Sequence, residues 1–424
     1  MNEKRRIVVL GGGFGGFMTV RHLVKLRFDG EIILIDKRDE HVFTPWLYEV
    51  ASGFLFSKEK TNLKDLKKTS GISFTNLIQA QDGARVRFKK QEVIGCDFDS
   101  KHLIFIDGKT LQFDELVLAV GSEVQFFNIP GVKENSRTLK TLQEAMEIQT
   151  EISKLLEELR LHKRDRIKIV IGGAGSTGVE LASELANCLN EASKNGQVDR
   201  TKIRILLIEA GDTVLQQMHP SLQLCVKKRL EKLGVELKLK TRLERLSKNR
   251  AHLVTVTTEN TATEIDFDIF IWAGGIRPTA LIESFDLPKD QRGRIEVEAT
   301  FQVKGRTDIF ALGDAAGLTS PYTKKSLPSL AQVAIRESRL VAQNIIRQQQ
   351  GKPLKIMKIP KQWIIITPAG GKYSFMRIFG INICGRSASW VRKIIDLQYF
   401  GTILPWPVFW RLWRSAEKVF SLND

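Results

Sequence analysis

Two glycine fingerprints of the form GxGxxG constrain this 424-residue chain more strongly than any other feature of its sequence. Each copy follows a short apolar run, opens a helical pattern and precedes a second apolar run that ends in an acid, Asp36 or Glu209. That arrangement is the βαβ context in which the motif binds a dinucleotide, so the sequence predicts two such sites. Their glycines are Gly11, Gly13 and Gly16 in the first copy, and Gly173, Gly175 and Gly178 in the second.

Each position of the fingerprint has a separate task. The first glycine allows a tight turn, the second lets a pyrophosphate approach the backbone, and the third lets the helix pack closely on the strand. The N–H groups at the helix N-terminus then bind the anion. Asp36 and Glu209 are placed to accept hydrogen bonds from a ribose diol, and the Glu209 carboxylate would repel a 2′-phosphate. We therefore expect the second site to prefer NADH to NADPH.

Two dinucleotide sites in one chain are what a flavoenzyme reduced by a nicotinamide cofactor requires. A further strand-like segment, TDIFALGD, ends in Asp314, where an acid can hold the ribityl chain of a flavin. The predicted fold class is α/β, with two Rossmann-like dinucleotide-binding domains of the FAD/NAD-linked reductase type. We expect residues 1–130 and 286–350 to bind FAD, residues 131–285 to bind NADH, and residues 351–424 to form a C-terminal membrane-associating region.

Positive charge and tryptophan gather at the C-terminal end. The chain carries 65 Lys and Arg against 48 Asp and Glu, a formal net charge of +17. Residues 351–424 hold 12 of those cations, only three of the acids, and five of the seven tryptophans. Indole prefers the headgroup zone and cations prefer anionic lipid, so this composition predicts a peripheral contact with an anionic lipid surface. The sequence has no run of 18 apolar residues, and no bilayer-spanning helix is expected.

The last predicted helix, from Pro407 onward, is amphipathic. Its apolar residues recur on one face, at Phe409, Leu412, Trp413, Ala416 and Phe420. This pattern is typical of a helix that lies in the plane of a membrane interface, so we expect that face to contact lipid. A helix packed on the protein's own core, or on a second copy in a homodimer, has the same pattern and stays an alternative.

The cysteines and histidines indicate neither disulfides nor a metal. Cys96, Cys188, Cys225 and Cys384 form no CxxC or other close pair in the sequence, and the six histidines are scattered. No histidine or cysteine lies in a recognisable flavin-attachment context, so a non-covalent FAD is expected and no metal site is predicted.

Segments spread over nearly the whole chain resemble the type II NADH:quinone oxidoreductases of the two-dinucleotide-binding-domain flavoprotein superfamily. Related disulfide reductases and sulfide:quinone oxidoreductases need cysteines at the flavin, and the cysteines of this chain do not follow that pattern. The segment at 41–53 and the last two segments discriminate best. The matching segments are GGGFGG (11–16), HVFTPWLYEVASG (41–53), GGAGSTGVELASEL (172–185), WAGGIRP (272–278), FALGDAA (310–316), AQVA (331–334) and SASWVRKIID (387–396).

This resemblance implies a set of residues for each cofactor. Those expected to contact FAD are Gly11, Gly13, Phe14, Gly15, Gly16, Asp36, Thr44, Pro45, Gly121, Asp314, Ala315 and Gln332. Those expected along NADH are Gly173, Gly175, Ser176, Thr177, Gly178, Glu180, Glu209 and Gly275. Glu180 matches a family glutamate near the nicotinamide and flavin, where a buried carboxylate could relay protons. Alternatively, its charge acts only on the helix N-terminus.

The quinone motif of the family, AQxxxQ, is altered in this chain. The segment AQVAIR keeps Gln332 but has Arg336 where the family has a second glutamine, and Glu337 is expected to pair with that cation. Arg392 and Ile395 match family positions beside the quinone entrance, within the region 351–424. The predicted catalytic residues are Glu180, Gln332 and Arg336.

The resemblance implies FAD-dependent oxidation of NADH with two-electron reduction of a membrane quinone, without proton pumping. Such a protein would be peripheral, on the cytoplasmic face of the cell membrane if it is bacterial. Reduction of a soluble acceptor such as ferredoxin or rubredoxin is an alternative, although such reductases need no tryptophan-rich C-terminal region. A basic redox-sensing protein similar to apoptosis-inducing factor is another, but the sequence holds no nucleic-acid motif and no such partner is expected.

Overall fold

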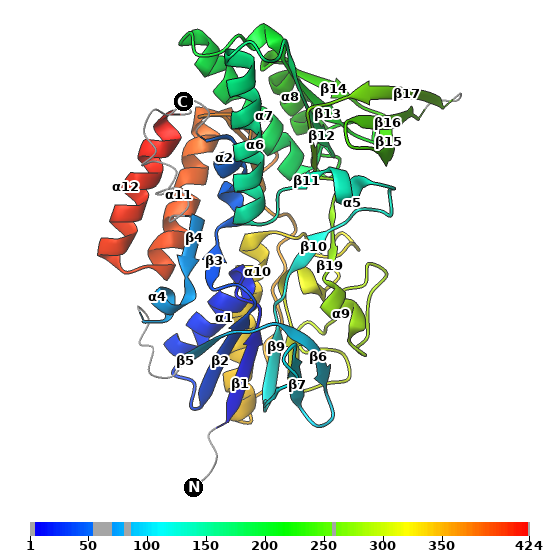
Figure 1. Ribbon diagram of the computed structural model, residues 1–424. Coiled ribbons are helices and arrows are strands. Elements are labelled where there is room, and N and C mark those ends of the chain that lie inside the picture. The colour runs from blue at the N-terminus through cyan, green and yellow to red at the C-terminus, as the bar shows by residue number, and fades with distance from the viewer. Residues whose placement is uncertain (1–4, 54–69, 80–85, 257–259, 423–424) are drawn as a thin grey trace. The chain divides into compact units, whose positions relative to one another are not determined.

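The computed structural model describes residues 5–53, 70–79, 86–256 and 260–422, with only the backbone described at 415–422. The chain divides into two compact units, each assembled from three separate segments (Figure 1). The first unit combines Met1–Val42, Ile72–Glu123 and Ile276–Trp363, and the second combines Phe43–Gly71, Val124–Gly275 and Ile364–Asp424.

The core of the first unit is a five-stranded parallel sheet in the order β21-β9-β1-β2-β5. Its central strands are rich in Ile, Val and Leu and are buried along almost their whole length, as strands covered on both faces must be. Helices α1 (Phe14–Lys25) and α10 (Ala331–Gln349) pack against each other. The strands are β1 (Arg6–Leu10), β2 (Glu31–Asp36), β5 (Val86–Lys90), β9 (Glu115–Leu118) and β21 (Ile309–Ala311).

The second unit repeats this plan with the order β11-β18-β12-β13-β14, again all parallel. Helices α6 (Leu142–Arg160) and α7 (Ser176–Lys194) both contact the short helix α2 (Leu47–Ser52). The strands are β11 (Arg137–Thr138), β12 (Ile167–Gly172), β13 (Ile203–Ile208), β14 (Val235–Lys238) and β18 (Ile269–Trp272).

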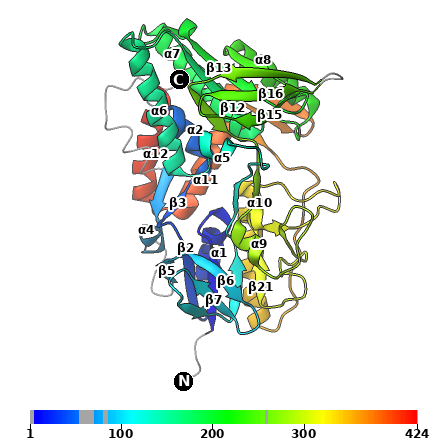
Figure 2. The ribbon, with the colours of Figure 1, turned by 45° about the vertical axis from the view of Figure 1, so that its right-hand side comes forward.

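The C-terminal residues also belong to the second unit. An antiparallel sheet of β23 (Ile366–Pro368), β24 (Ser374–Ile378) and β25 (Ile381–Gly385) packs against α7 and α8 (Pro220–Lys232). Helices α11 (Arg386–Ile403) and α12 (Trp406–Leu422) follow and lie side by side (Figures 1 and 2). Among the described residues, every helix is too short or too polar to cross a bilayer.

The remaining elements are short, and several of them form small sheets apart from the sheets already described. They are β3 (Glu40–Val42), η1 (Thr44–Trp46), β4 (Gly71–Ser73), α4 (Phe74–Gln79), β6 (Val93–Asp97), β7 (His102–Phe105), β8 (Thr110–Gln112), β10 (Ser122–Val124), α5 (Val132–Asn135), η3 (Arg200–Lys202), β15 (Thr241–Leu246), β16 (Arg250–Thr255), β17 (Thr261–Asp266), β19 (Ile276–Pro278), α9 (Ala280–Ser284), β20 (Ile295–Glu296), η4 (Gly313–Ala315) and β22 (Ala316–Gly317).

The predicted fold class is confirmed by these two sheets. Each fingerprint lies between a buried parallel strand and a helix, as its βαβ context requires. The two crossovers differ mainly in helix length, because α7 has 19 residues and α1 has 12.

Candidate functional site

The first fingerprint has the geometry of a dinucleotide cradle. Gly11 has φ +102°, and a Cβ there would lie 2.3 Å from the Ala119 carbonyl oxygen. A Cβ at Gly16 would lie 1.8 Å from the Gly11 carbonyl oxygen, so both positions require glycine. Around Gly13, no heavy atom of the described residues lies within 4 Å of such a Cβ. The second glycine therefore faces the open space that a pyrophosphate needs.

The second fingerprint reproduces these features in the other unit. Gly173 has φ +103°, and a Cβ there would lie 2.5 Å from the Ala273 carbonyl oxygen. A Cβ at Gly178 would approach the Gly173 carbonyl oxygen to 1.9 Å, whereas none of the described atoms would lie within 4 Å of one at Gly175. Gly13 and Gly175 are also the N-cap residues of α1 and α7. A glycine brings no side chain to the first helical N–H groups, which suits an anion.

The two strand-terminal acids hold equivalent positions. The Asp36 carboxylate accepts a hydrogen bond from the Gly12 N–H at 2.7 Å, and the Glu209 carboxylate accepts one from the Ala174 N–H at 2.7 Å. Glu209 also accepts a hydrogen bond from the Gly211 N–H at 2.8 Å. Each carboxylate has about four acceptor sites, so oxygen lone pairs remain for ribose hydroxyls.

Asp314 lies with the first fingerprint in the same unit. It belongs to η4, which Leu312 separates from β21, and accepts a hydrogen bond from the Ser122 hydroxyl at 2.5 Å. A Cβ at Gly15 would lie 2.1 Å from Leu312 Cδ1, which shows how closely α1 approaches the end of β21. The structure thus brings the predicted FAD residues of this unit to the carboxyl end of one parallel sheet, where ligands of such sheets bind.

The start of α10 carries the altered quinone motif. Gln332 and Arg336 are exposed, and the Arg336 guanidinium lies over the Trp363 ring at 5.3 Å. Glu337 was expected to pair with Arg336, but its buried carboxylate accepts a hydrogen bond from the Gly313 N–H at 2.6 Å instead. The reason is the helical periodicity, which turns successive residues by about 100° and so directs Glu337 into the core.

A buried polar cluster forms where α2 meets α11 in the second unit. We call it the Arg392 cluster. The Arg392 guanidinium donates a hydrogen bond to Glu49 at 2.9 Å, and the Tyr48 hydroxyl donates to the same carboxylate at 2.8 Å. Asp396 lies 3.8 Å from Arg392 and accepts a hydrogen bond from the Trp46 indole N–H at 3.1 Å. Both carboxylates are buried, and the Arg392 cation lies beside both of them.

Glu180 lies in the electrostatic field of this cluster. Burial raises the pKa of its carboxyl group from 4.5 to about 8, and Arg392 partly offsets this shift. Burial likewise raises the pKa of Glu49, again with Arg392 opposing the shift. The predicted residues Glu180 and Arg392 therefore interact electrostatically within the second unit, which also contains Thr44 and Pro45 of η1.

The remaining predicted residues divide between the two units. Gly121, Ala315 and Phe14 belong to the first unit, in which the Phe14 ring meets the His41 ring edge-on at 5.4 Å. Ser176 and Thr177 begin α7 in the second unit, and Gly275 accepts a hydrogen bond from the Gln125 N–H at 3.0 Å. Ile395 lies on α11 with its side chain about half exposed.

Several residues of the site were not predicted individually from the sequence. Glu49, Tyr48 and Trp46 lie within the segment 41–53, and Asp396 ends the segment 387–396, but no role was assigned to them. An acid within an apolar stretch and the i,i+4 spacing of Arg392 and Asp396 were the available signals. Among the described residues, no group of three or more His, Cys, Asp and Glu side chains could hold a metal ion.

The raised carboxyl pKa values predict a pH dependence of stability. Burial raises the pKa of Glu337 to about 8, as it does for Glu180. Between about pH 4.5 and 8 the folded protein retains these protons and the unfolded chain does not, so the free energy of unfolding falls as pH rises. We expect Glu180→Gln and Glu337→Gln each to reduce this slope in denaturant titrations from pH 5 to 9. A variant with the parent's pH profile would show that its glutamate ionises normally.

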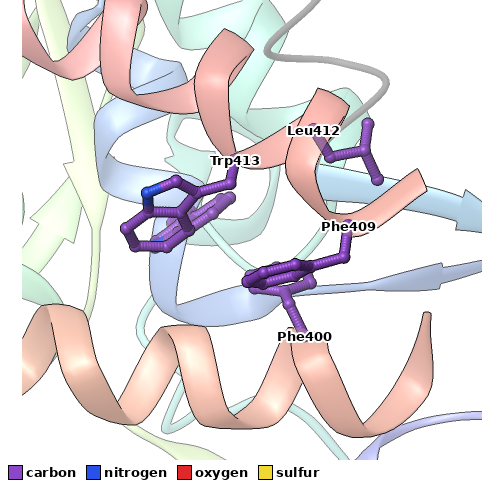
Figure 3. Close-up of a pocket in the computed structure, with 5 residues that line it drawn as sticks. Phe400, Phe409, Leu412 and Trp413 are labelled. Carbon is purple, nitrogen blue, oxygen red and sulfur yellow. The ribbon is translucent and has the colours of Figure 1, made fainter. Parts of the chain in front are cut away.

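The apolar face of α12 is packed inside the second unit, which corrects the expectation that it contacts lipid. Phe409 and Trp413 are 4% and 9% exposed, and with Leu412 they line a small pocket whose other walls are Phe400 and Trp46 (Figure 3). The alternative of a helix packed on the protein's own core is correct for these residues, because α11 offers an aromatic partner surface. The side chains of Ala416 and Phe420 lie outside the described residues.

The chain has two parallel sheets, and each carries a glycine cradle and a strand-terminal acid. This arrangement is typical of a protein that binds two dinucleotides. The family model of the pyridine nucleotide-disulphide oxidoreductases matches residues 5–338, and the chain belongs to that family. It is 29% identical over 409 residues to the demethylphylloquinone reductase NdbB of Synechocystis, covering 95% of this chain and 93% of that protein. The type II NADH:quinone oxidoreductase of Staphylococcus saprophyticus is 27% identical, over 93% of this chain and 95% of its own length.

A solved structure is similar to this fold over nearly all of the chain. NDH2 from Plasmodium falciparum, solved in complex with NADH, aligns with a TM-score of 0.83 and 20% identity, covering 97% of each chain. The similarity includes the C-terminal elements that lie beyond the match to the family model.

Proposed function

We propose that this protein oxidises NADH with a bound FAD and passes two electrons to a membrane quinone. The observation that carries this proposal is the pair of complete dinucleotide cradles, each with open space at its second glycine. Full-length similarity to a type II NADH:quinone oxidoreductase and to a demethylphylloquinone reductase supports the quinone as acceptor. When bound, the flavin supplies hydride acceptance from NADH and electron delivery to the quinone.

We assign FAD to the unit with Gly13 and NADH to the unit with Gly175. In the first unit, the α1 N-terminus would bind the pyrophosphate, Asp36 the ribose, and Asp314 the ribityl chain. In the second unit, the α7 N-terminus and Glu209 would hold NADH in the same way. Both assignments rest on the glycine-capped helix N-termini and on the strand-terminal carboxylates that are hydrogen-bonded to the same glycine loops.

The proton chemistry is assigned to Glu180 and the Arg392 cluster. With a pKa of about 8, Glu180 holds a proton at neutral pH and can release it when a nearby group accepts it. Arg392 would orient the carboxylates and favour the anionic form of a reduced acceptor. Gln332, Arg336 and Ile395 are the further residues that we propose for quinone recognition.

Steady-state kinetics with different acceptors tests the proposed function. We expect NADH oxidation by the purified FAD-loaded protein to be fast with a short-chain quinone and slow with ferredoxin or rubredoxin. Faster turnover with the soluble protein acceptors would support the alternative reductase. Salt-dependent retention on DNA without quinone turnover would instead indicate a nucleic-acid-binding flavoprotein.

The second cradle predicts the choice of nicotinamide cofactor. We expect NADH to be preferred over NADPH, because a charge conflict between Glu209 and a 2′-phosphate is worth a few kcal/mol in a partly desolvated site. Glu209→Arg should reduce the ratio of the two kcat/KM values by at least about tenfold, which corresponds to about 1.4 kcal/mol. Asp212→Asn, an exposed neighbour, is the matched control and should leave the ratio unchanged. Equal kcat/KM values in the unmodified protein would refute the assignment.

We further propose that the protein binds an anionic membrane surface peripherally through the exposed indoles of α11 and α12. Trp390 is 70% exposed, Trp406 66% and Trp410 40%, in a region that carries nine more cations than acids. Tryptophan and cations together suit the headgroup zone. A second copy of the chain on this face would instead appear as a concentration-dependent mass in the absence of vesicles.

Point substitutions test this surface better than truncation, because removing α12 would expose Phe400. We expect the double variant Trp406→Ser/Trp410→Ser to reduce binding to anionic vesicles by at least about tenfold, since burying a large apolar side chain contributes about 1.5–3 kcal/mol. Ile106→Ser, at another exposed apolar position, should bind like the parent. Unchanged co-sedimentation of the double variant would exclude this face as the membrane contact.

A further inference from the structure

Two free cysteines that are far apart in the sequence lie on facing elements of the second unit. Cys225 lies on α8 and Cys384 lies on β25, and both side chains are partly accessible to solvent. Neither residue takes part in the cofactor cradles or the Arg392 cluster.

Contacts one helical turn to either side place the two thiols opposite each other. Four residues before Cys225, the Ser221 hydroxyl accepts a hydrogen bond from the Asn382 side chain at 2.7 Å. Four residues after it, the Arg229 guanidinium lies over the Tyr373 ring at 4.5 Å. Residues at i, i+4 and i+8 share one helix face, so the middle residue of this face is Cys225.

The strands present a matching row of side chains. Cys384 is two residues after Asn382 on β25, and side chains two apart point to the same face of a strand. Its cross-strand partner Phe375 is likewise two residues after Tyr373. One helical turn rises about 5.4 Å, and two strand residues span about 6.6 Å. The side chains on the helix face are therefore spaced nearly as far apart as those on the strand.

The pKa of Cys384 agrees with a position of its side chain beside the Cys225 thiol. Burial and the neighbouring Cys225 thiol together raise the pKa of Cys384 to about 11. Cys384 is therefore protonated at neutral pH, and oxidation that needs its thiolate should become faster as pH rises.

We propose that Cys225 and Cys384 are a redox modification site that a hydroperoxide converts reversibly into a disulfide. One thiolate attacks the O–O bond of hydrogen peroxide, forming a sulfenic acid and releasing the other oxygen as water. The second thiol then attacks that sulfur and releases a second water. In total, the two thiols lose two protons and two electrons, and one peroxide takes these up and is reduced to two waters.

The disulfide would connect α8 to the strand that leads directly into α11. β25 ends at Gly385, and α11 begins at Arg386, six residues before Arg392. Oxidation would thus fix the helix of the proposed NADH-binding unit to the C-terminal elements. Because a crosslink restricts the unfolded chain, the oxidised protein should unfold at a higher temperature than the reduced protein.

Peptide mass spectrometry of the full-length holoprotein tests the proposal. The reduced protein is treated with a small excess of hydrogen peroxide, alkylated without reduction and digested. We expect a crosslinked peptide pair containing Cys225 and Cys384, two hydrogens lighter than the sum of the free peptides, which dithiothreitol separates. Cys96 and Cys188 should not be oxidised and should be found alkylated, because burial raises the pKa of Cys96 to about 12 and Cys188 is buried.

Two variants and a thermal measurement serve as controls. Cys225→Ser should lose both the crosslink and the rise in Tm on oxidation, whereas Cys96→Ser should keep both. If Cys225→Ser does not fold, the test rests on the unmodified protein. The crosslinked peptide pair must then appear after peroxide treatment and be separated by dithiothreitol. Oxidation of Cys384 to a sulfinic acid, or a crosslink to another cysteine, would overturn the proposal.

Discussion

Gly175→Ala is expected to impair NADH-dependent flavin reduction severely while leaving the protein folded and yellow. The new methyl group would occupy the open space at the α7 N-terminus, where no described atom lies within 4 Å of the Cβ position. Gly175 has φ −72°, which alanine adopts without strain. A pyrophosphate held away from the backbone would lose at least two charge-assisted hydrogen bonds, worth about 1.5–3 kcal/mol each. We therefore expect kcat/KM for NADH to fall on the order of 100-fold or more.

Three further glycines provide the controls for this experiment. Gly13→Ala should reduce FAD retention in the same way, because its position is equivalent in the first cradle. Gly178→Ala should destabilise the fold itself, because its Cβ would lie 1.9 Å from the Gly173 carbonyl oxygen. Gly401→Ala lies within α11 and should leave activity unchanged and stabilise the helix by up to about 1 kcal/mol. Stopped-flow flavin reduction and thermal unfolding measure these effects, and normal NADH kinetics in Gly175→Ala would contradict the assignment.

The second large effect is expected from Arg392→Met, which removes the cation of the Arg392 cluster. Breaking a buried pair from one side costs about 3–5 kcal/mol, because it leaves an uncompensated buried charge. Glu49 and Asp396 would both be left in this state, and the pKa of Glu49, already raised by burial, would rise further. The carboxylates are protonated at low pH, so the loss of stability should be largest at neutral pH and decrease toward pH 4.5.

A double-mutant cycle measures the interaction between Glu49 and Arg392 apart from the effect of each substitution alone. Glu49→Gln/Arg392→Met should be more stable than Arg392→Met alone, because one of the unpaired charges is absent. Arg160→Met removes the exposed partner of Glu157 on α6 and should have little measurable effect, as is usual for exposed pairs. Denaturant titrations at pH 5 and pH 7.5 measure these differences. An Arg392→Met variant as stable as Arg160→Met at both pH values would show that the cluster does not stabilise the fold.

The α/β fold and both cradles could be predicted because their determinants are local. A glycine with φ near +100°, a second glycine facing open space and a third under a carbonyl oxygen lie within six residues. The strand-terminal acid then bonds to the residue after the first glycine, Gly12 or Ala174. Each requirement concerns the conformation of one short segment, so the residue types and their spacing were sufficient to predict the fold.

Contacts between distant segments were decided only by the tertiary structure. Arg392 and Glu49 are separated by 343 residues, and the four cysteines showed no close pair in the sequence although Cys225 and Cys384 face each other. Helical periodicity identified the apolar face of α12 but not its partner, because lipid and the aromatic side chains of α11 favour the same residues. The sequence by itself thus determined the elements whose conformation is local. The pairing of buried charges, thiols and apolar faces depended on which surfaces the folded chain brings together.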